Sequence, residues 1–256
     1  LRAKREVLRS YLNNRRITWF DDPSNEDDRY DRIKARNALA LLTPLGIDVE
    51  ALGEVARNMT QARRALEWQT FLAARQMISI QAGAVVLDEI LLRLQPDEVQ
   101  RRLIIKAVIW VNGRTYTPRQ SALASVMAAL GESQAATLAG CHIRRIAAQI
   151  WVFREHKAVC DTETATDVFW DGRWKLTPSH PADNDPEYRV RALGHAGLEQ
   201  CPDWRAAGFP HVVLQSTPSI WKGDELVAAP LAGHPQNWQA ELCEKDDTFF
   251  ATLLSH

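Results

Sequence analysis

The spacing of apolar residues changes near Thr137, and this change limits which folds the chain can adopt. Before it, apolar side chains recur at three- and four-residue steps, which predicts a helix that packs in a bundle seam. The clearest such set is Leu52, Val55, Met59, Ala62 and Leu66. From Cys141 to Arg154 apolar and polar residues alternate, which predicts antiparallel strands. The sequence therefore predicts an α+β protein that is helical first and rich in strands later.

Turn and cap residues divide this pattern into three expected domains. Pro44 and Gly46 end one helix, and Pro96 and Pro118 stand where prolines favour a first helical turn. We expect a helical segment at residues 1–47 and an all-α domain at 48–135, with short strands at 84–87. Residues 136–256 should form an α+β domain rich in antiparallel strands, which includes a hairpin that turns at residues 222–224.

Charge is distributed unevenly along the 256 residues. Residues 1–157 hold 24 Lys and Arg against 17 Asp and Glu, whereas residues 158–256 hold 7 against 15. A net +7 followed by a net −8 favours a front part that faces an anion, although unrelated drift in surface charge explains it equally well.

The composition otherwise indicates a soluble protein. The sequence has no membrane-length apolar run and no secretory signal, and its four cysteines form no C-x-x-C pair. We expect reduced thiols, no metal site, no membrane association and a cytoplasmic location.

Residues 21–36 read DDPSNEDDRYDRIKAR and combine a stiff turn with a basic helix. Pro23 restricts φ, and the short side chains of Asp22, Ser24 and Asn25 can bond to nearby backbone. Arg29, Arg32 and Arg36 are spaced i, i+3, i+7, which predicts three guanidinium groups on one helix face. Such a face suits a polyanion. The acidic run at residues 26–28 could bind Mg²⁺, but carboxylates at the positive helix start are the better explanation.

This stretch resembles the tRNA(Ile)-lysidine synthases, which are PP-loop ATPases. Their motif is roughly W-x-E-D-x-S-N-x-D-x-x-[FY]-x-R-N-x-x-R, with matches here at Trp19, Asp22, Ser24, Asn25, Asp27, Tyr30, Arg32 and Arg36. Asp21 replaces the glutamate and Ile33 replaces the asparagine, so no polar role carries over to residue 33. Three later segments are also similar to the family: residues 116–119, residues 137–155 and the hairpin at 218–230.

The resemblance implies a carbon–nitrogen ligase that modifies tRNA. In that family ATP, with Mg²⁺, adenylates the C2 carbonyl of the wobble cytidine of tRNA(Ile), and the amine of free lysine then displaces AMP. The ATP-binding S-G-G-x-D-S segment has no counterpart in this chain. We therefore expect the later part of a longer enzyme, inactive by itself and without ATP or Mg²⁺ bound. Residues 1–47 would end the catalytic domain, and residues 48–135 would handle tRNA.

We expect no catalytic residue in this chain, and we expect a set of residues that supports tRNA or the active site. The set is Asp22, Ser24, Asn25, Arg29, Arg32, Arg36, Arg119, Arg144 and Arg145. Arg119 at a helix start could hold a phosphate, or could be an ordinary surface arginine. Arg144 and Arg145 point to opposite faces of a strand, so at most one readily contacts a ligand.

The role of the tryptophans and the function of the chain each have an alternative explanation. Exposed tryptophans could stack on RNA bases. Packing in the core or on a sheet is the favoured role for the six tryptophans that follow the apolar spacing of predicted helices and strands: Trp68, Trp110, Trp151, Trp170, Trp174 and Trp221. The alternative functions are a PP-loop relative that modifies another tRNA base, and a non-catalytic module that binds protein or RNA.

Overall fold

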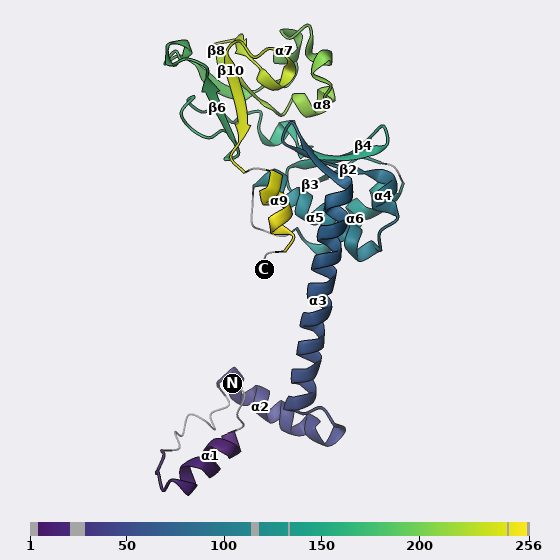
Figure 1. Cartoon of the computed structure of the whole chain (residues 1–256), viewed down its shortest axis with the longest axis vertical. Coiled ribbons are helices and arrows are strands. Elements are labelled where there is room, and N and C mark those ends of the chain that lie inside the picture. The colour runs from purple at the N-terminus through teal and green to yellow at the C-terminus, as the bar shows by residue number, and fades with distance from the viewer. Residues whose placement is uncertain (1–4, 21–28, 114–117, 133, 245, 255–256) are drawn as a thin grey trace. The chain divides into compact units, whose positions relative to one another are not determined.

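The computed structural model describes residues 5–20, 29–113, 118–132, 134–244 and 246–254. The chain divides into two compact units, Leu1–Arg63 and Arg64–His256, and each is described by itself. Helices occur together with antiparallel sheets of five, three and two strands (Figure 1). The predicted α+β class is confirmed, and the division into three domains stays a prediction.

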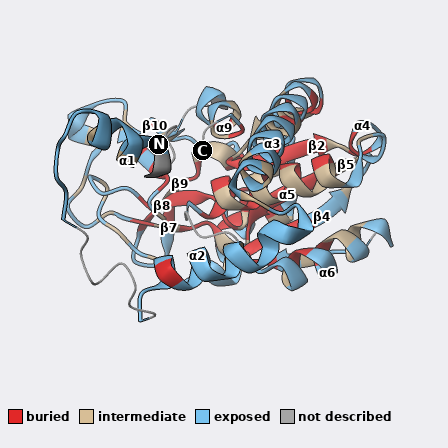
Figure 2. Ribbon diagram, turned by 90° about the horizontal axis from the view of Figure 1, so that it is seen from below, coloured by how far each residue is buried: buried red, intermediate tan, exposed pale blue. Residues whose placement is uncertain are grey.

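The first unit contains α1 (Arg5–Asn14), α2 (Asp31–Leu42) and the beginning of α3 (Val49–Met77). α2 ends as predicted, because Pro44 follows in a 3-10 turn and Gly46 takes a left-handed φ of 79°. Ile33 is the one buried side chain among the described residues of this unit. Figure 2 shows it as a single buried segment on an otherwise mostly exposed α2.

Two predictions for this unit are wrong. Arg29 precedes α2, because Tyr30 is extended and caps the helix, so Arg29 does not share a helix face with Arg32 and Arg36. The predicted bundle seam is exposed rather than packed: the exposed fractions are 48% for Leu52, 55% for Val55 and 64% for Met59. Periodicity shows that a face is apolar, but not what covers it. Asp22, Ser24 and Asn25 lie outside the described residues.

The second unit is built on a five-stranded antiparallel sheet in the order β1-β2-β5-β4-β3. The strands are β1 (Ile78–Gln81), β2 (Ala84–Asp88), β3 (Ala136–Leu138), β4 (Cys141–Ile146) and β5 (Gln149–Arg154). β2 pairs with β5, with Leu87 opposite Ile150. β2 confirms the short strand predicted at 84–87, whereas β1 was not predicted, and both join a sheet that continues beyond residue 135.

Both faces of this sheet are covered. Val85 and Leu87 pack toward α5 (Asp97–Asn112) and α6 (Gln120–Gly131), whereas Val86 packs on the opposite face with Trp151 and Phe153. β2 therefore reads as an uninterrupted apolar run, as expected of a strand covered on both faces. Figure 2 shows buried residues along β2, β5 and α5. Pro96 precedes α5, as predicted.

The C-terminal part adds two small antiparallel sheets. β6 (Trp174–Pro178) pairs with β10 (Trp238–Leu242), and β7, β8 and β9 form the other. The bounds of these three strands are Arg189–Ala192, Pro218–Lys222 and Glu225–Ala228. β8 and β9 form the predicted hairpin. The remaining short helices are α4 (Glu89–Arg93), α7 (Gly194–Glu199), α8 (His211–Leu214) and α9 (Asp246–Thr252).

A buried ion pair joins this C-terminal part to the five-stranded sheet. Arg154 at the end of β5 donates to both carboxylate oxygens of Asp171 at 2.7 Å, and to the carbonyl of Gly140 at 3.1 Å. The two side chains are 9% and 11% exposed. Gly140 has a φ of 73°, and a Cβ there would lie 2.9 Å from Arg154 Nη1, so any other residue would be strained and would displace the guanidinium.

Replacing Asp171 with asparagine should destabilise the second unit by about 3 kcal/mol, because the buried charge of Arg154 would lose its partner. Asparagine tolerates the left-handed φ of 49° at this turn, so the substitution tests the charge. Urea unfolding would measure the loss. The exposed control Asp161→Asn should change the free energy of unfolding by less than about 0.5 kcal/mol. Equal effects of the two substitutions would contradict the prediction.

Candidate nucleic-acid interface

One face of α5 carries three cations and one carboxylate. Glu98 accepts hydrogen bonds from Arg101 Nε at 2.6 Å and from Arg102 Nε at 2.7 Å. These bonds, with that from Arg101 the larger contribution, lower the pKa of Glu98 to about 2 although partial burial acts to raise it. Two guanidinium groups share one carboxylate, so this face keeps a net positive charge.

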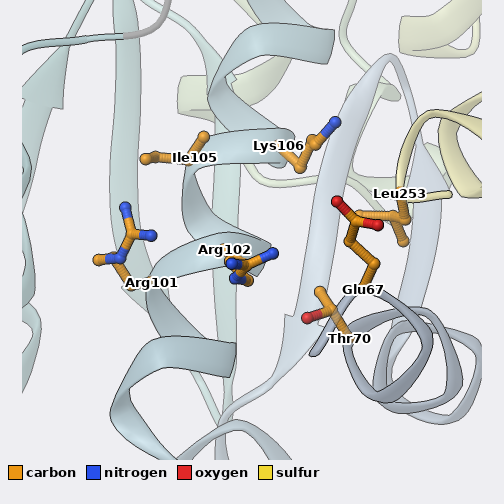
Figure 3. A pocket seen from close by; sticks show the side chains of 7 residues that line it. All are labelled: Glu67, Thr70, Arg101, Arg102, Ile105, Lys106 and Leu253. Carbon is orange, nitrogen blue, oxygen red and sulfur yellow. The ribbon is translucent and has the colours of Figure 1, made fainter. Parts of the chain in front are cut away.

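These arginines line a pocket of about 250 Å³ between α5 and the second half of α3 (Figure 3). The lining residues are Glu67, Thr70, Arg101, Arg102, Ile105, Lys106 and Leu253. Figure 3 shows Arg102 and Lys106 on α5 on the side that faces Glu67 of α3. The volume is below the range of about 300–1,000 Å³ typical of cofactor sites, so the pocket suits a phosphate or sugar group better than a whole nucleotide.

Lys106 connects this pocket to the C-terminal segment. Its Nζ donates to the carbonyl oxygen of Thr252 at 2.6 Å. Burial lowers the pKa of Lys106, and the negative charge of Glu67 opposes that shift. We infer that Lys106 mainly holds the end of α9 in place, which leaves the two arginines as the cations most suited to a ligand.

Trp68 lies on α3 directly after Glu67 and is 54% exposed. Its ring stacks on Phe71, with centroids 5.5 Å apart and planes 26° apart. The packing expected of the tryptophans is therefore wrong for Trp68, because its helix position faces solvent. The other five are buried: Trp110, Trp151, Trp170, Trp174 and Trp221. An exposed indole suits stacking on a nucleobase.

The predicted arginines are divided between the two units. Arg32 and Arg36 lie exposed on α2 in the first unit, and the Arg32 guanidinium carbon is 4.8 Å from the ring centre of Tyr30. Arg119 is exposed immediately before α6, in an extended conformation. The opposite end of α6 lies beside Glu89, because Leu130 and Gly131 line a pocket together with that residue.

Arg144 and Arg145 differ as the strand pattern predicts. Arg144 stands opposite Trp151 and is exposed, whereas Arg145 stands opposite Ile150, which packs in the helix-covered core. Arg145 Nε lies 2.7 Å from a carboxylate oxygen of Glu89, which also pairs with Arg93 at 2.6 Å. Arg144 is thus the better placed of the two to contact a ligand.

The sequence analysis missed Arg101 and Arg102, although a signal was present. Glu98, Arg102 and Lys106 recur at four-residue steps on the face of α5 that the apolar stripe of Val99 and Leu103 leaves open. The carboxylate one turn before two adjacent arginines predicts the shared hydrogen bonds.

Two features that commonly hold Mg²⁺ or ATP are absent from the described residues. Across the described ranges, no three His, Cys, Asp or Glu side chains gather as metal ligands do. The sequence contains no glycine-rich phosphate loop of the S-G-G-x-D-S kind. In the same ranges, no helix is both long enough and apolar enough to cross a membrane. No chemical step through ATP or a metal is therefore derived from this chain.

Replacing Glu98 with glutamine should lower stability modestly, in a way that depends on pH. Because the pKa of Glu98 is about 2 instead of 4.5, its stabilisation is present above pH 4.5 and is lost as the pH falls toward 2. Glu98 and Arg101 are each 39% exposed and Arg102 is 25% exposed, so solvent screening limits the effect to about 1 kcal/mol or less at pH 7. Urea unfolding of both proteins from pH 7 to pH 2.5 would measure the difference. A difference in the free energy of unfolding that persists undiminished at pH 2.5 would contradict this assignment.

The amino-acid sequence of this chain is similar to those of several known proteins. No protein-family model matches it. It is 48% identical over 252 residues to a tRNA(Ile)-lysidine synthase of Ruegeria pomeroyi, a match that covers 98% of this chain and 59% of that protein. It is 25% identical over 185 residues to that of Wolbachia pipientis wMel, which covers 69% of this chain and 43% of the relative. The chain therefore spans about half the length of these curated relatives. The predicted resemblance is confirmed: across almost its whole length, this chain is related to the tRNA(Ile)-lysidine synthases.

Proposed function

We propose that this chain binds and orients tRNA(Ile) as part of a tRNA(Ile)-lysidine synthase. The observation that carries the proposal is the 48% identity to such an enzyme over 98% of the chain. The whole enzyme would use ATP to join lysine to C2 of the wobble cytidine through an adenylated intermediate. ATP, Mg²⁺ and lysine would bind outside this chain, whose residues contribute positioning.

The basic face of α5 supports an RNA-binding role. A guanidinium presents a planar fork of donors that matches phosphate oxygens, and Glu98 holds the Arg101 and Arg102 forks in defined orientations. Ordered forks lose less conformational entropy when phosphate binds. Trp68 adds an exposed ring on α3, the helix that contributes Glu67 and Thr70 to the pocket. A phosphate contact and a stacked base together would fix both the position and the rotation of an RNA segment.

Other predicted residues keep proposed supporting roles. Arg32, Arg36, Arg119 and Arg144 are exposed and suit additional phosphate contacts. Arg145 is engaged by Glu89, so we propose that it orders the strand rather than touching RNA. Asp22, Ser24, Asn25 and Arg29 are proposed to support the active-site region. These residues would help to orient the reacting base of the tRNA, because a small misplacement of that base greatly lowers the reaction rate.

Binding of tRNA(Ile) as a function of salt concentration tests the proposal. The logarithm of the association constant should fall linearly with the logarithm of salt concentration, with a slope of about −0.7 to −0.9 per phosphate neutralised. A fluorescence anisotropy titration of labelled tRNA from 50 to 300 mM salt would provide the slope. Absence of any salt-dependent tRNA binding would overturn the proposal in favour of a protein-interaction module.

The double substitution Arg101→Gln and Arg102→Gln should weaken tRNA(Ile) binding at least about tenfold, because two charge-assisted contacts to phosphate would be lost. The magnitude of the salt slope should also decrease by about 2. The matched control is Arg189→Gln with Arg205→Gln, two exposed arginines in the acidic C-terminal part. This control should change the affinity less than about twofold. Equal losses in both double variants would show that the α5 face has no special role.

A further inference from the structure

The pocket between α3 and α5 contains a carboxylate that the binding of a phosphate does not explain. Glu67 lines this pocket together with Arg101, Arg102 and Lys106. Figure 3 shows the Glu67 side chain extending from α3 toward α5. Like charges repel across a binding site, so this carboxylate would weaken the binding of an RNA phosphate alone. The pocket therefore suits a ligand that presents an anion to the arginines and a hydrogen-bond donor to Glu67.

The cationic and anionic groups of this pocket are both accessible to a ligand. Glu67 is half-buried, and the Arg101 and Arg102 side chains are 39% and 25% exposed. A carboxylate has about four lone-pair sites, so a contact between Glu67 and a cation leaves it able to accept another hydrogen bond. Thr70 is 2% exposed, and its hydroxyl donates to the carbonyl of Leu66 at 2.6 Å. Thr70 therefore shapes the wall of the pocket without contacting a ligand through its hydroxyl.

Lys106 gives Glu67 an alternative role, which is to balance a neighbouring charge. Burial lowers the pKa of Lys106, and the negative charge of Glu67 acts against that shift. A Glu67 with this role alone would affect the binding of every polyanion equally. A Glu67 that accepts a hydrogen bond from a ligand would instead favour the ligands that carry the donor. The two roles therefore differ in a measurable quantity, the preference for one type of nucleic acid over another.

The ribose 2′-hydroxyl is the donor of RNA that fits the space in this pocket. The volume of about 250 Å³ suits a sugar with its phosphate and leaves the base outside. Within the sugar–phosphate backbone, the 2′-hydroxyl is the group that donates a hydrogen bond, and DNA lacks it. Ile105 is half-buried and adds an apolar surface that suits the C–H groups of a sugar. The lining of the pocket thus matches a ribose and its phosphate.

We propose that this pocket selects RNA over DNA, with the Glu67 carboxylate accepting a hydrogen bond from a ribose 2′-hydroxyl while Arg101 and Arg102 hold a neighbouring phosphate. The inference rests on the proposed binding of tRNA(Ile) and names the part of the RNA that this pocket recognises. Glu67 is a specificity-determining residue and takes no part in the reaction. Every nucleotide of RNA carries the hydroxyl, so the contact recognises the type of sugar and not the base sequence.

The test compares the full chain with its Glu67→Ala variant in binding two probes, the tRNA(Ile) transcript and a deoxyribose copy of the same sequence that keeps uracil. The ratio of the two dissociation constants, DNA over RNA, measures the preference for the hydroxyl. Removal of one negative charge strengthens phosphate binding in both probes, so that effect cancels in the ratio. The ratio should fall about tenfold in Glu67→Ala, because a hydrogen bond to a charged group is lost. An unchanged ratio would overturn the proposal.

Two further variants separate recognition from folding, and the Tm of each variant shows that it is folded. Glu67→Gln keeps the shape of the side chain and an acceptor oxygen but removes the charge. Its ratio should fall only about threefold, because a neutral hydrogen bond is weaker than a charge-assisted one. Glu54→Ala replaces an exposed glutamate of α3 that does not line the pocket, and should leave the ratio unchanged. An unchanged ratio in Glu67→Gln, or an equal fall in Glu54→Ala, would overturn the assignment to this pocket.

The outcome for the sugar contact is distinguishable from the outcome for tRNA binding. The Arg101→Gln, Arg102→Gln variant should bind both probes more weakly, because RNA and DNA share their phosphates. Binding of tRNA(Ile) with an unchanged ratio in Glu67→Ala would overturn the sugar contact and leave the proposed function intact. Absence of tRNA binding by the unsubstituted chain would overturn both.

Discussion

The contact between Arg154 and Asp171 determines how the larger unit is assembled. Arg154 ends a central strand of the five-stranded sheet, and Asp171 sits in the turn before β6, so their two hydrogen bonds connect the sheet to the part that follows. Removing two charges from water offsets much of their attraction, and such a pair contributes little net stability. Breaking it is costly, however, because one charge would stay buried. We infer that the pair selects one arrangement of the two parts, and Arg173 with the Gly83 carbonyl adds a second connection.

Helix α5 serves packing and recognition at the same time. Its apolar face, which includes Val99, Leu103 and Ala107, is fully buried in the main core. Its N-terminal half carries Arg101 and Arg102 toward one pocket, and Trp110 near its C-terminal end packs against the Arg173 guanidinium. A helix held along its length by a sheet is a rigid support, so groups on its other faces keep their positions without a ligand. The proposed phosphate contact at Arg101 and Arg102 benefits from this rigidity.

Arginines in this chain fall into two physical classes that net charge cannot distinguish. Arg145 and Arg154 are engaged by Glu89 and Asp171, and their charge organises the fold. Arg101 and Arg102 share a single carboxylate, so part of their charge remains available to a ligand. The positive excess counted over residues 1–157 includes both classes. The net charge of residues 1–157 therefore overstates the positive charge available to RNA. Which arginines can contact RNA depends on which of them are paired with carboxylates.

The sequence alone determined many of the local elements and the resemblance to known proteins. Periodicity located α3 and α5, Pro44 and Gly46 marked the end of α2, and the motif around Trp19 to Arg36 identified the lysidine synthase relatives. Tertiary structure decided that β2 lies inside a sheet with β5, and which arginines are paired. Arg154 and Asp171 are 17 residues apart, and Arg173 and Gly83 are 90 apart. Local patterns encode short-range geometry, whereas contacts between distant residues depend on strand register and packing, which no single segment specifies.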